Sequence, residues 1–181
     1  DWSSDVCSSD LEKVIERIAS PTRVPLVLGG DHTVTWPNVT GVARARGWGR
    51  VAVIHFDAHA DTGDIEFGSL VGHGQPMRRL LESGAVRGDR FFQVGLRGYW
   101  PPPDILEWMA DQRMRSYEMT EVVERGLDEV LGEVIEAAQA DCDGVFLSVD
   151  IDVVDPGLAP GTGTPEPGGL DRKSTRLNSS H

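Results

Sequence analysis

Two short segments of the chain carry carboxylates and imidazoles at alternate positions, each directly after a run of apolar residues. In extended backbone, side chains two positions apart point to the same face. Buried carboxylates gathered in this way need a counter-charge or a metal ion, because an unpaired buried charge is costly. The predicted metal ligands in these segments are Asp57, His59, Asp61, Asp150 and Asp152.

A further candidate ligand, His32, follows the glycine pair Gly29-Gly30. The whole set offers four carboxylates and two imidazoles, which is enough to hold two divalent cations that share bridging carboxylates. Oxygen and imidazole ligands without a thiolate favour Mn²⁺, although spacing alone leaves Zn²⁺, Fe²⁺ and Co²⁺ open. We therefore expect a site for two Mn²⁺ ions.

The elements that must position these residues follow from an alternation of short β-rich runs with stretches of helical period. This alternation is typical of a parallel sheet with helices on both faces, a three-layer α/β/α fold. Ligand sites in such sheets lie beyond the carboxyl ends of the strands. The predicted strands are 24–28, 51–56, 90–96, 114–117 and 144–149, and the predicted helices are 36–46, 76–83, 103–112 and 120–140, the last with Thr120 as its N-cap.

Four motifs occur in order along the chain: Gly29–His32, Asp57–Asp61, His73–Pro76 and the stretch Ser148–Pro165. Together they resemble the ureohydrolases, the family of arginases, agmatinases and relatives that hydrolyse guanidines to urea and an amine. The resemblance implies an arginase-deacetylase-like, mostly parallel sheet whose C-terminal part is missing from this sequence. It also implies that one Mn²⁺ is bound by His32, Asp57, Asp61 and Asp150, and the other by Asp57, His59, Asp150 and Asp152.

The resemblance further implies a reaction. Two metal ions lower the pKa of a shared water toward about 7, and the resulting hydroxide attacks the guanidinium carbon. His73 resembles the proton-shuttle histidine of the family and is expected to act as a general acid toward the departing amine. His55 is expected to be structural, with its side chain facing away from the ligands.

The expected substrate is a small cationic guanidine, with agmatine favoured. Arginase-like sequences usually have an Asn where this chain has Gly63, and the stretch from Pro160 to Gly169 is similar to that of agmatinases. Other guanidino-acid ureohydrolases share these features. A zinc amide hydrolase of the deacetylase type and an inactive metal-binding fragment are the remaining alternatives.

Both ends of the sequence look unlike its middle. Residues 1–11 and 171–180 can be back-translated into complementary strands of one DNA sequence, so they resemble translated sequencing adaptor. We expect 1–11 and 171–181 to be artefactual tails around a partial ureohydrolase domain, 12–170. The guanidinium-binding Glu of the family belongs to a later segment than this domain reaches.

The net charge and the composition exclude some classes of binding partner and indicate a cellular compartment. The formal net charge of −12 argues against nucleic acid and anionic membranes as partners. No apolar run approaches the roughly 20 residues needed to cross a bilayer. Cys142 is the one cysteine outside the predicted tails, so a reducing compartment, the cytoplasm, is expected. The family resemblance implies a homo-oligomer, a trimer or hexamer, for the full-length protein.

Overall fold

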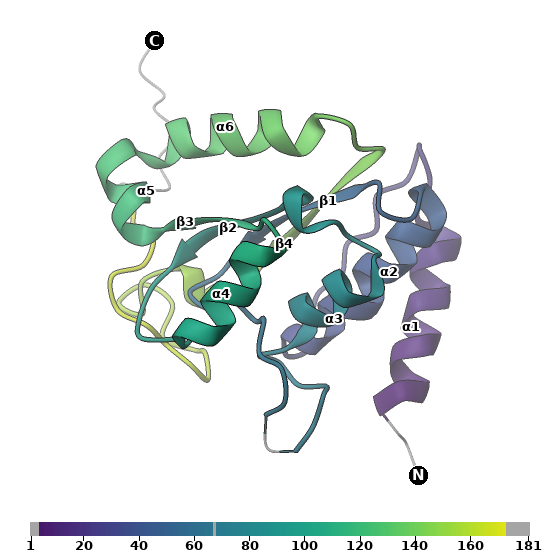
Figure 1. Ribbon diagram of the computed structural model, residues 1–181, viewed down its shortest axis with the longest axis horizontal. Helices are drawn as coiled ribbons and strands as arrows, with labels where there is room; N and C mark the ends of the chain where they lie inside the picture. Colours follow the sequence, from purple (N-terminus) through teal and green to yellow (C-terminus); the bar gives the residue numbers. More distant parts are fainter. Residues whose placement is uncertain (1–3, 67, 173–181) are drawn as a thin grey trace.

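A four-stranded parallel sheet forms the centre of the protein. The computed structural model describes residues 4–66 and 68–172 (Figure 1). The strands are β1 (Val51–Phe56), β2 (Phe91–Leu96), β3 (Arg115–Glu118) and β4 (Gly144–Val149), in the order β3-β2-β1-β4. Each neighbouring pair is parallel. The parallel sheet agrees with the expected fold class, and four of the five predicted strands are present.

Helices cover both faces of this sheet and make the three expected layers. In Figure 1, α5 and α6 lie on one side of the strands, whereas α2, α3 and α4 lie on the other, with α1 packed outside α2. The helix bounds are α1 (Ser4–Ile18), α2 (Thr35–Arg46), α3 (Pro76–Ser83), α4 (Pro103–Asp111), α5 (Met119–Arg125) and α6 (Leu127–Gln139).

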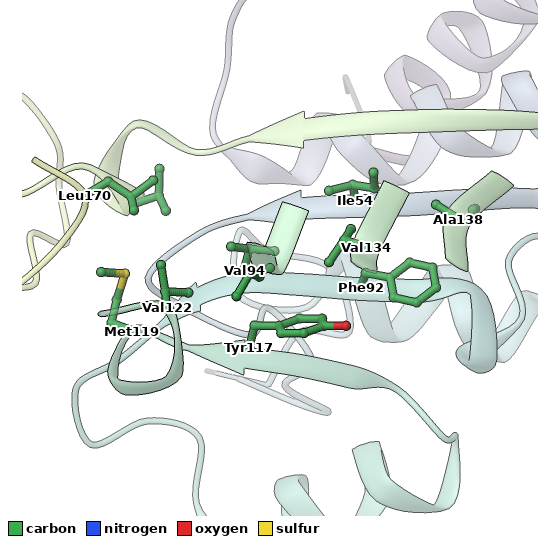
Figure 2. Close-up of a cluster of buried hydrophobic side chains, with 12 residues drawn as sticks. Ile54, Phe92, Val94, Tyr117, Met119, Val122, Val134, Ala138 and Leu170 are labelled. Atoms are coloured by element: carbon green, nitrogen blue, oxygen red, sulfur yellow. The ribbon is translucent and has the colours of Figure 1, made fainter. Parts of the chain in front are cut away.

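The alternation of side chains along β1 explains why the sheet has two buried faces. Ala52 and Ile54 point to a cluster of apolar side chains from α5 and α6, part of which Figure 2 shows. Val51 and Val53 point to the opposite cluster, which α2 and α3 complete. A strand buried on both faces is a short, continuous apolar run. β1 is therefore fixed between two packed layers of apolar side chains, one on each face of the sheet.

The second cluster provides a stability prediction. Leu80 of α3 is fully buried within it, whereas Leu106 of α4 is 47 % exposed. Leu80→Ala is expected to lower the free energy of unfolding by about 2–5 kcal/mol, because it removes buried apolar surface and leaves a cavity. Urea denaturation followed by circular dichroism measures the change. The matched variant Leu106→Ala should cost under about 1 kcal/mol, and equal losses in the two variants would contradict this packing.

The predicted strand 24–28 is wrong. The segment is not a strand and pairs with no strand of the described residues, and Val24, Leu26 and Leu28 are 92 %, 83 % and 85 % exposed. Apolar β-prone residues form a strand only where a neighbouring strand completes their hydrogen bonds. β4 is an edge strand of the sheet, and among the described residues β1 is its one strand partner.

The predicted helix 120–140 is two helices. Gly126 lies between α5 and α6 with a φ of 85°, a left-handed conformation that ends the first helix. Thr120 is not the N-cap, because α5 begins at Met119 and the capping position is Glu118. The helical conformation of this stretch is confirmed, whereas the break at Gly126 was not predicted.

The N-terminal helix crosses the boundary predicted for the first tail. It begins at Ser4 and continues without a break past Glu12 to Ile18, and it packs closely on α2, where a Cβ at Gly41 would lie 2.6 Å from the Glu12 carbonyl oxygen. Tail residues 1–3 and 173–181 lie outside the described residues, so the tail assignment stays a prediction. Within the described residues, no helix is both long enough and apolar enough to cross a membrane.

Candidate metal centre

The carboxyl ends of β1 and β4 bring the two predicted ligand segments together. These strands are adjacent and parallel, with Phe56 opposite Val149, so the residues that follow them emerge at the same edge of the sheet. Backbone N–H groups hydrogen-bond across the two segments there. The Asp150 N–H donates to the Phe56 carbonyl oxygen (2.8 Å), and the Ala58 N–H donates to Asp152 Oδ1 (3.0 Å). The fold thus fixes the spacing between the segments.

His32 reaches this edge from a short 3₁₀ turn. Its Nε2 lies 2.7 Å from the Ser148 hydroxyl oxygen, which fixes the orientation of the ring. Its Nδ1 faces carboxylate oxygens of Asp57 and Asp61, each at 2.9 Å, and of Asp150 at 3.4 Å. This buried nitrogen nevertheless has no partner with hydrogen-bond geometry among the described residues. This nitrogen and the carboxylate oxygens converge on a common region, as metal ligands do.

A second group of ligand atoms surrounds His59. Its Nδ1 lies 3.0 Å from Asp152 Oδ2 and 3.6 Å from Asp57 Oδ1, and its backbone N–H donates to the same Asp57 oxygen at 2.6 Å. The ligand atoms of Asp57, His59 and Asp152 lie within 4.8 Å of one another. Asp57 therefore belongs to both groups, the one around His32 and the one around His59.

His55 does not face away from the ligands as expected. It is fully buried, its Nε2 lies 2.8 Å from Asp57 Oδ2, and its ring packs against Phe91 at 5.9 Å. His55 and Asp57 are two positions apart in extended backbone at the end of β1, so their side chains share a face. Gln93 Nε2 contacts the other ring nitrogen at 3.2 Å. His55 therefore orients the Asp57 carboxylate from behind, the contact expected of a residue that supports a metal ligand.

Burial and mutual repulsion alter the acidity of the carboxylates. Burial raises the pKa of Asp61 to about 6, and the neighbouring Asp57 charge adds to the shift while His32 opposes it. Burial also raises the pKa of Asp150. Burial opposes ionisation of Asp57 as well, but the charge of His55 and the contacts with His32 and His55 hold its pKa well below the usual range.

The two candidate histidine ligands respond to the same negative charge. Burial disfavours the charged form of His32, but the adjacent carboxylates of Asp57 and Asp61 outweigh it and raise its pKa to about 10. The contacts of His59 with Asp152 and Asp57 raise its pKa to about 10 against the effect of burial. Protons on these rings thus neutralise part of the carboxylate charge.

The cluster has the properties that a divalent cation requires. Four carboxylates lie close together, three of them at most 8 % exposed, and buried like charges are stable only with compensating positive charge. The buried Nδ1 of His32 has no hydrogen-bond partner among the described residues. All the ligand atoms are oxygen or nitrogen, which suits hard and borderline cations such as Mn²⁺.

The cluster opens into a cavity of about 1130 Å³. All six predicted ligands line it, and so does His73, which is exposed on the loop before α3. The hydrogen bond from the Gly63 N–H to the Gly74 carbonyl oxygen (2.9 Å) ties this loop to the segment after Asp61. The structure therefore places His73 at the same cavity as the ligands without placing it among them.

Two residues near the cluster were not predicted as site residues. The Thr164 hydroxyl contacts Asp152 Oδ2 at 3.4 Å, and the Arg97 guanidinium donates to the carbonyl oxygens of Asp152 (2.5 Å) and Glu166 (2.7 Å). Arg97 directly follows β2. Its place at a strand's carboxyl end was the available signal, but a single arginine carries no spacing pattern.

The fold and this cluster define a three-layer α/β/α protein with a carboxylate-and-imidazole site at the carboxyl ends of its parallel strands. The chain belongs to the arginase family, because residues 3–177 match the sequence pattern of that family. The ureohydrolase resemblance of the four sequence motifs is thereby confirmed.

Curated relatives carry several different names. The chain is 39 % identical over 160 residues to a guanidinobutyrase of Pseudomonas aeruginosa, covering 88 % of this chain and 49 % of the relative. It is 40 % identical over 156 residues to a mitochondrial agmatinase of Gallus gallus, covering 86 % of this chain and 44 % of the relative. The chain thus spans about half the length of the curated relatives it matches.

Solved structures agree with the architecture. The formimidoylglutamase of Bacillus subtilis superposes with a TM-score of 0.88 at 30 % identity, over 96 % of this chain and 54 % of that one. An arginase from Bacillus caldovelox gives a TM-score of 0.84 at 30 % identity, over 93 % of this chain and 60 % of that one. The expected arginase-like fold class is confirmed.

Proposed function

We propose that the cluster binds two Mn²⁺ ions and that the full-length protein hydrolyses a guanidine to urea and an amine. The observation that carries this proposal is the buried Nδ1 of His32, which faces carboxylate oxygens without a hydrogen bond to any of them. The proposed ligand sets are the two predicted from the resemblance. The first consists of His32, Asp57, Asp61 and Asp150, and the second of Asp57, His59, Asp150 and Asp152.

The geometry supports Asp57 as a bridging ligand. One of its oxygens, Oδ2, faces His32, and the other, Oδ1, faces His59. Asp150 extends to the His32 group at 3.4 Å and is 26 % exposed at the cavity. Its participation in both ligand sets rests on the family resemblance.

The proposed reaction needs a nucleophile and a proton donor. When bound, a pair of divalent cations supplies hydroxide from water at neutral pH. The C–N bond to the amine nitrogen then breaks, and that nitrogen must gain a proton to leave. His73 is the proposed general acid, because it lies exposed at the cavity and is not held among the ligands. An imidazole suits this role near neutral pH.

Agmatine, a guanidine with a cationic tail, is the proposed substrate. Besides the four carboxylate ligands, Asp31 and Glu66 line the cavity, and the described lining residues include no Lys or Arg. A negative cavity attracts a dication and repels a carboxylate tail. Among the relatives, the names guanidinobutyrase and guanidinopropionase point to acidic tails instead, so guanidino acids are the main competing substrates.

Urea release tests the proposed function. The Mn²⁺-loaded full-length protein is assayed with agmatine, arginine and 4-guanidinobutyrate, and Asp150→Ala serves as the inactive control. We expect urea from agmatine at the highest kcat/KM and none from the control. A preference for guanidinobutyrate would overturn the substrate, and no urea from any guanidine by a protein that binds metal would overturn the reaction.

The raised histidine pKa values predict proton release on metal binding. With pKa values of about 10, His32 and His59 are protonated at pH 8 in the metal-free protein, whereas a metal ligand must be a neutral imidazole. Mn²⁺ binding at pH 8 should therefore release about two protons per chain from these rings, in addition to the proton lost by a cation-bound water. Asp61, with a pKa of about 6, is already ionised at that pH. The histidine share of the release should disappear as the pH rises above the two histidine pKa values.

Titration calorimetry in buffers of different ionisation enthalpy measures this release. The observed heat should depend on the buffer in proportion to the protons released, and His73→Asn should behave like the wild type because His73 is not a ligand. A heat that is the same in every buffer would contradict the assignment of His32 and His59 as protonated ligands.

A further inference from the structure

The imidazole of His59 lies between carboxylates on its two sides. Its Nδ1 faces Asp152 and Asp57 in the cluster. Its Nε2 lies 3.8 Å from Glu166 Oε1, and the Glu166 side chain is 23 % exposed. Glu166 belongs to the loop that follows β4 and lies more than a hundred residues along the chain from His59. The fold, and not local sequence, brings this carboxylate to the ring.

If His59 is a ligand, one of its ring nitrogens binds the cation and the other carries the proton. An imidazole that offers the Nδ1 lone pair to a cation must carry its proton on Nε2, and an acceptor for that N–H fixes both the tautomer and the ring orientation. We propose that Glu166 is this acceptor: a positioning residue whose carboxylate holds the Nε2–H of His59 and so directs Nδ1 toward the second cation. This inference rests on the proposed function, since it requires His59 to bind a metal ion.

Glu166 is held in place by its backbone. Its carbonyl oxygen accepts hydrogen bonds from Arg97 Nη2 (2.7 Å) and Nε (3.1 Å), and Arg97 also donates to the Pro167 carbonyl oxygen at 3.1 Å. Pro165 and Pro167 flank it, and a proline restricts both its own backbone and that of the residue before it. The carboxylate therefore extends from a stiff, anchored segment.

The surroundings of the carboxylate also restrict its position. A Cβ added at Gly98 would lie 2.9 Å from Glu166 Cδ and within 3.1 Å of both carboxylate oxygens. Gly98 has a φ of 82°, a conformation that favours glycine, so the carboxylate packs directly over a backbone without a side chain.

The same geometry separates Glu166 from the ligands themselves. Nδ1 and Nε2 point away from each other on the ring, so the residue at Nε2 lies on the far side of the ring from the cation at Nδ1. Arg97 joins the two sides, since its Nη2 donates to the carbonyl oxygens of both Glu166 and Asp152. One guanidinium thus sets the position of the acceptor relative to the ligand segment.

Manganese binding, read without any substrate, tests the proposal. Free Mn²⁺ is measured by its electron paramagnetic resonance signal during titration of the metal-free full-length protein. The wild type should bind two ions. Glu166→Ala should weaken the affinity for one ion by about 10–100-fold and leave the affinity for the other unchanged, as is usual when the partner of a ligand histidine is lost. Glu166→Gln, which keeps an acceptor oxygen, should restore most of the lost affinity.

Controls separate positioning from general damage to the fold. Glu107→Ala removes an exposed carboxylate from α4 and should bind both ions like the wild type. Arg97→Lys keeps the charge but not the forked set of hydrogen bonds. It should weaken the affinity for the same ion as Glu166→Ala does.

Each outcome has a definite meaning. Two ions bound with unchanged affinity in Glu166→Ala would overturn the role of Glu166 and leave the proposed function standing. Equal loss in Glu166→Ala and Glu166→Gln would also overturn it, because the acceptor oxygen would then not matter. A wild type that binds two ions yet releases no urea would overturn the proposed reaction and leave the role of Glu166 standing, whereas a wild type that binds no ion would overturn both.

Discussion

Asp57→Asn is expected to lower urea release by a factor of about 10³ or more and to remove both Mn²⁺ ions. The carboxylate faces His32 with one oxygen and His59 with the other, so its loss affects both ligand groups at once. Metal ions contribute several kcal/mol of transition-state stabilisation, and each 1.4 kcal/mol corresponds to about tenfold in rate. Asn keeps the volume of Asp but lacks the negative charge that holds a cation.

The measurement combines kcat/KM for urea release with metal content after gel filtration. Asp111→Asn, which changes an exposed carboxylate at the end of α4, is the matched control and should retain two ions and full activity. Circular dichroism verifies that Asp57→Asn is folded. Retention of two ions by a folded Asp57→Asn would contradict the shared-ligand assignment.

His73→Asn is expected to have a different signature, with kcat reduced by about 10²–10⁴-fold and both ions retained. A general acid contributes a factor of this size, and His73 lies at the cavity but outside both ligand groups. Because the substitution removes the proton donor and leaves the cations, the KM for agmatine should change far less than kcat.

Steady-state kinetics on metal-counted protein measure this separation. A small imidazole added to the assay should recover part of the activity of His73→Asn, since the donor is exposed at the cavity. Loss of metal from His73→Asn would indicate that His73 is a ligand. An unchanged kcat would indicate that another group donates the proton.

Much of the cluster could be predicted because its signal is local. Alternate spacing after an apolar run gave Asp57, His59 and Asp61, and the same pattern gave Asp150 and Asp152. The structure brings these five side chains and His32 to one cavity. The predicted bounds of β1, α3 and β4 agree with the structure for a related reason, since buried runs between turn-forming residues are strongly patterned.

Contacts between distant parts of the chain were not predictable in the same way. Ser148 holds Nε2 of His32 from 116 positions away, and Arg97 reaches carbonyl oxygens 55 and 69 positions away. Such contacts depend on which strands are neighbours, a property of the whole sheet. The error at 24–28 has the same origin, because a strand needs a partner that local sequence does not identify.

The most direct test of the central claim is a count of the metal ions bound per chain. The full-length protein is loaded with Mn²⁺ and freed of excess metal by gel filtration. Its manganese content is then measured by inductively coupled plasma mass spectrometry and divided by the protein concentration. The shared position of Asp57 between His32 and His59 predicts two ions per chain. One ion would contradict the paired site and favour a mononuclear amide hydrolase, and none would contradict the metal centre altogether.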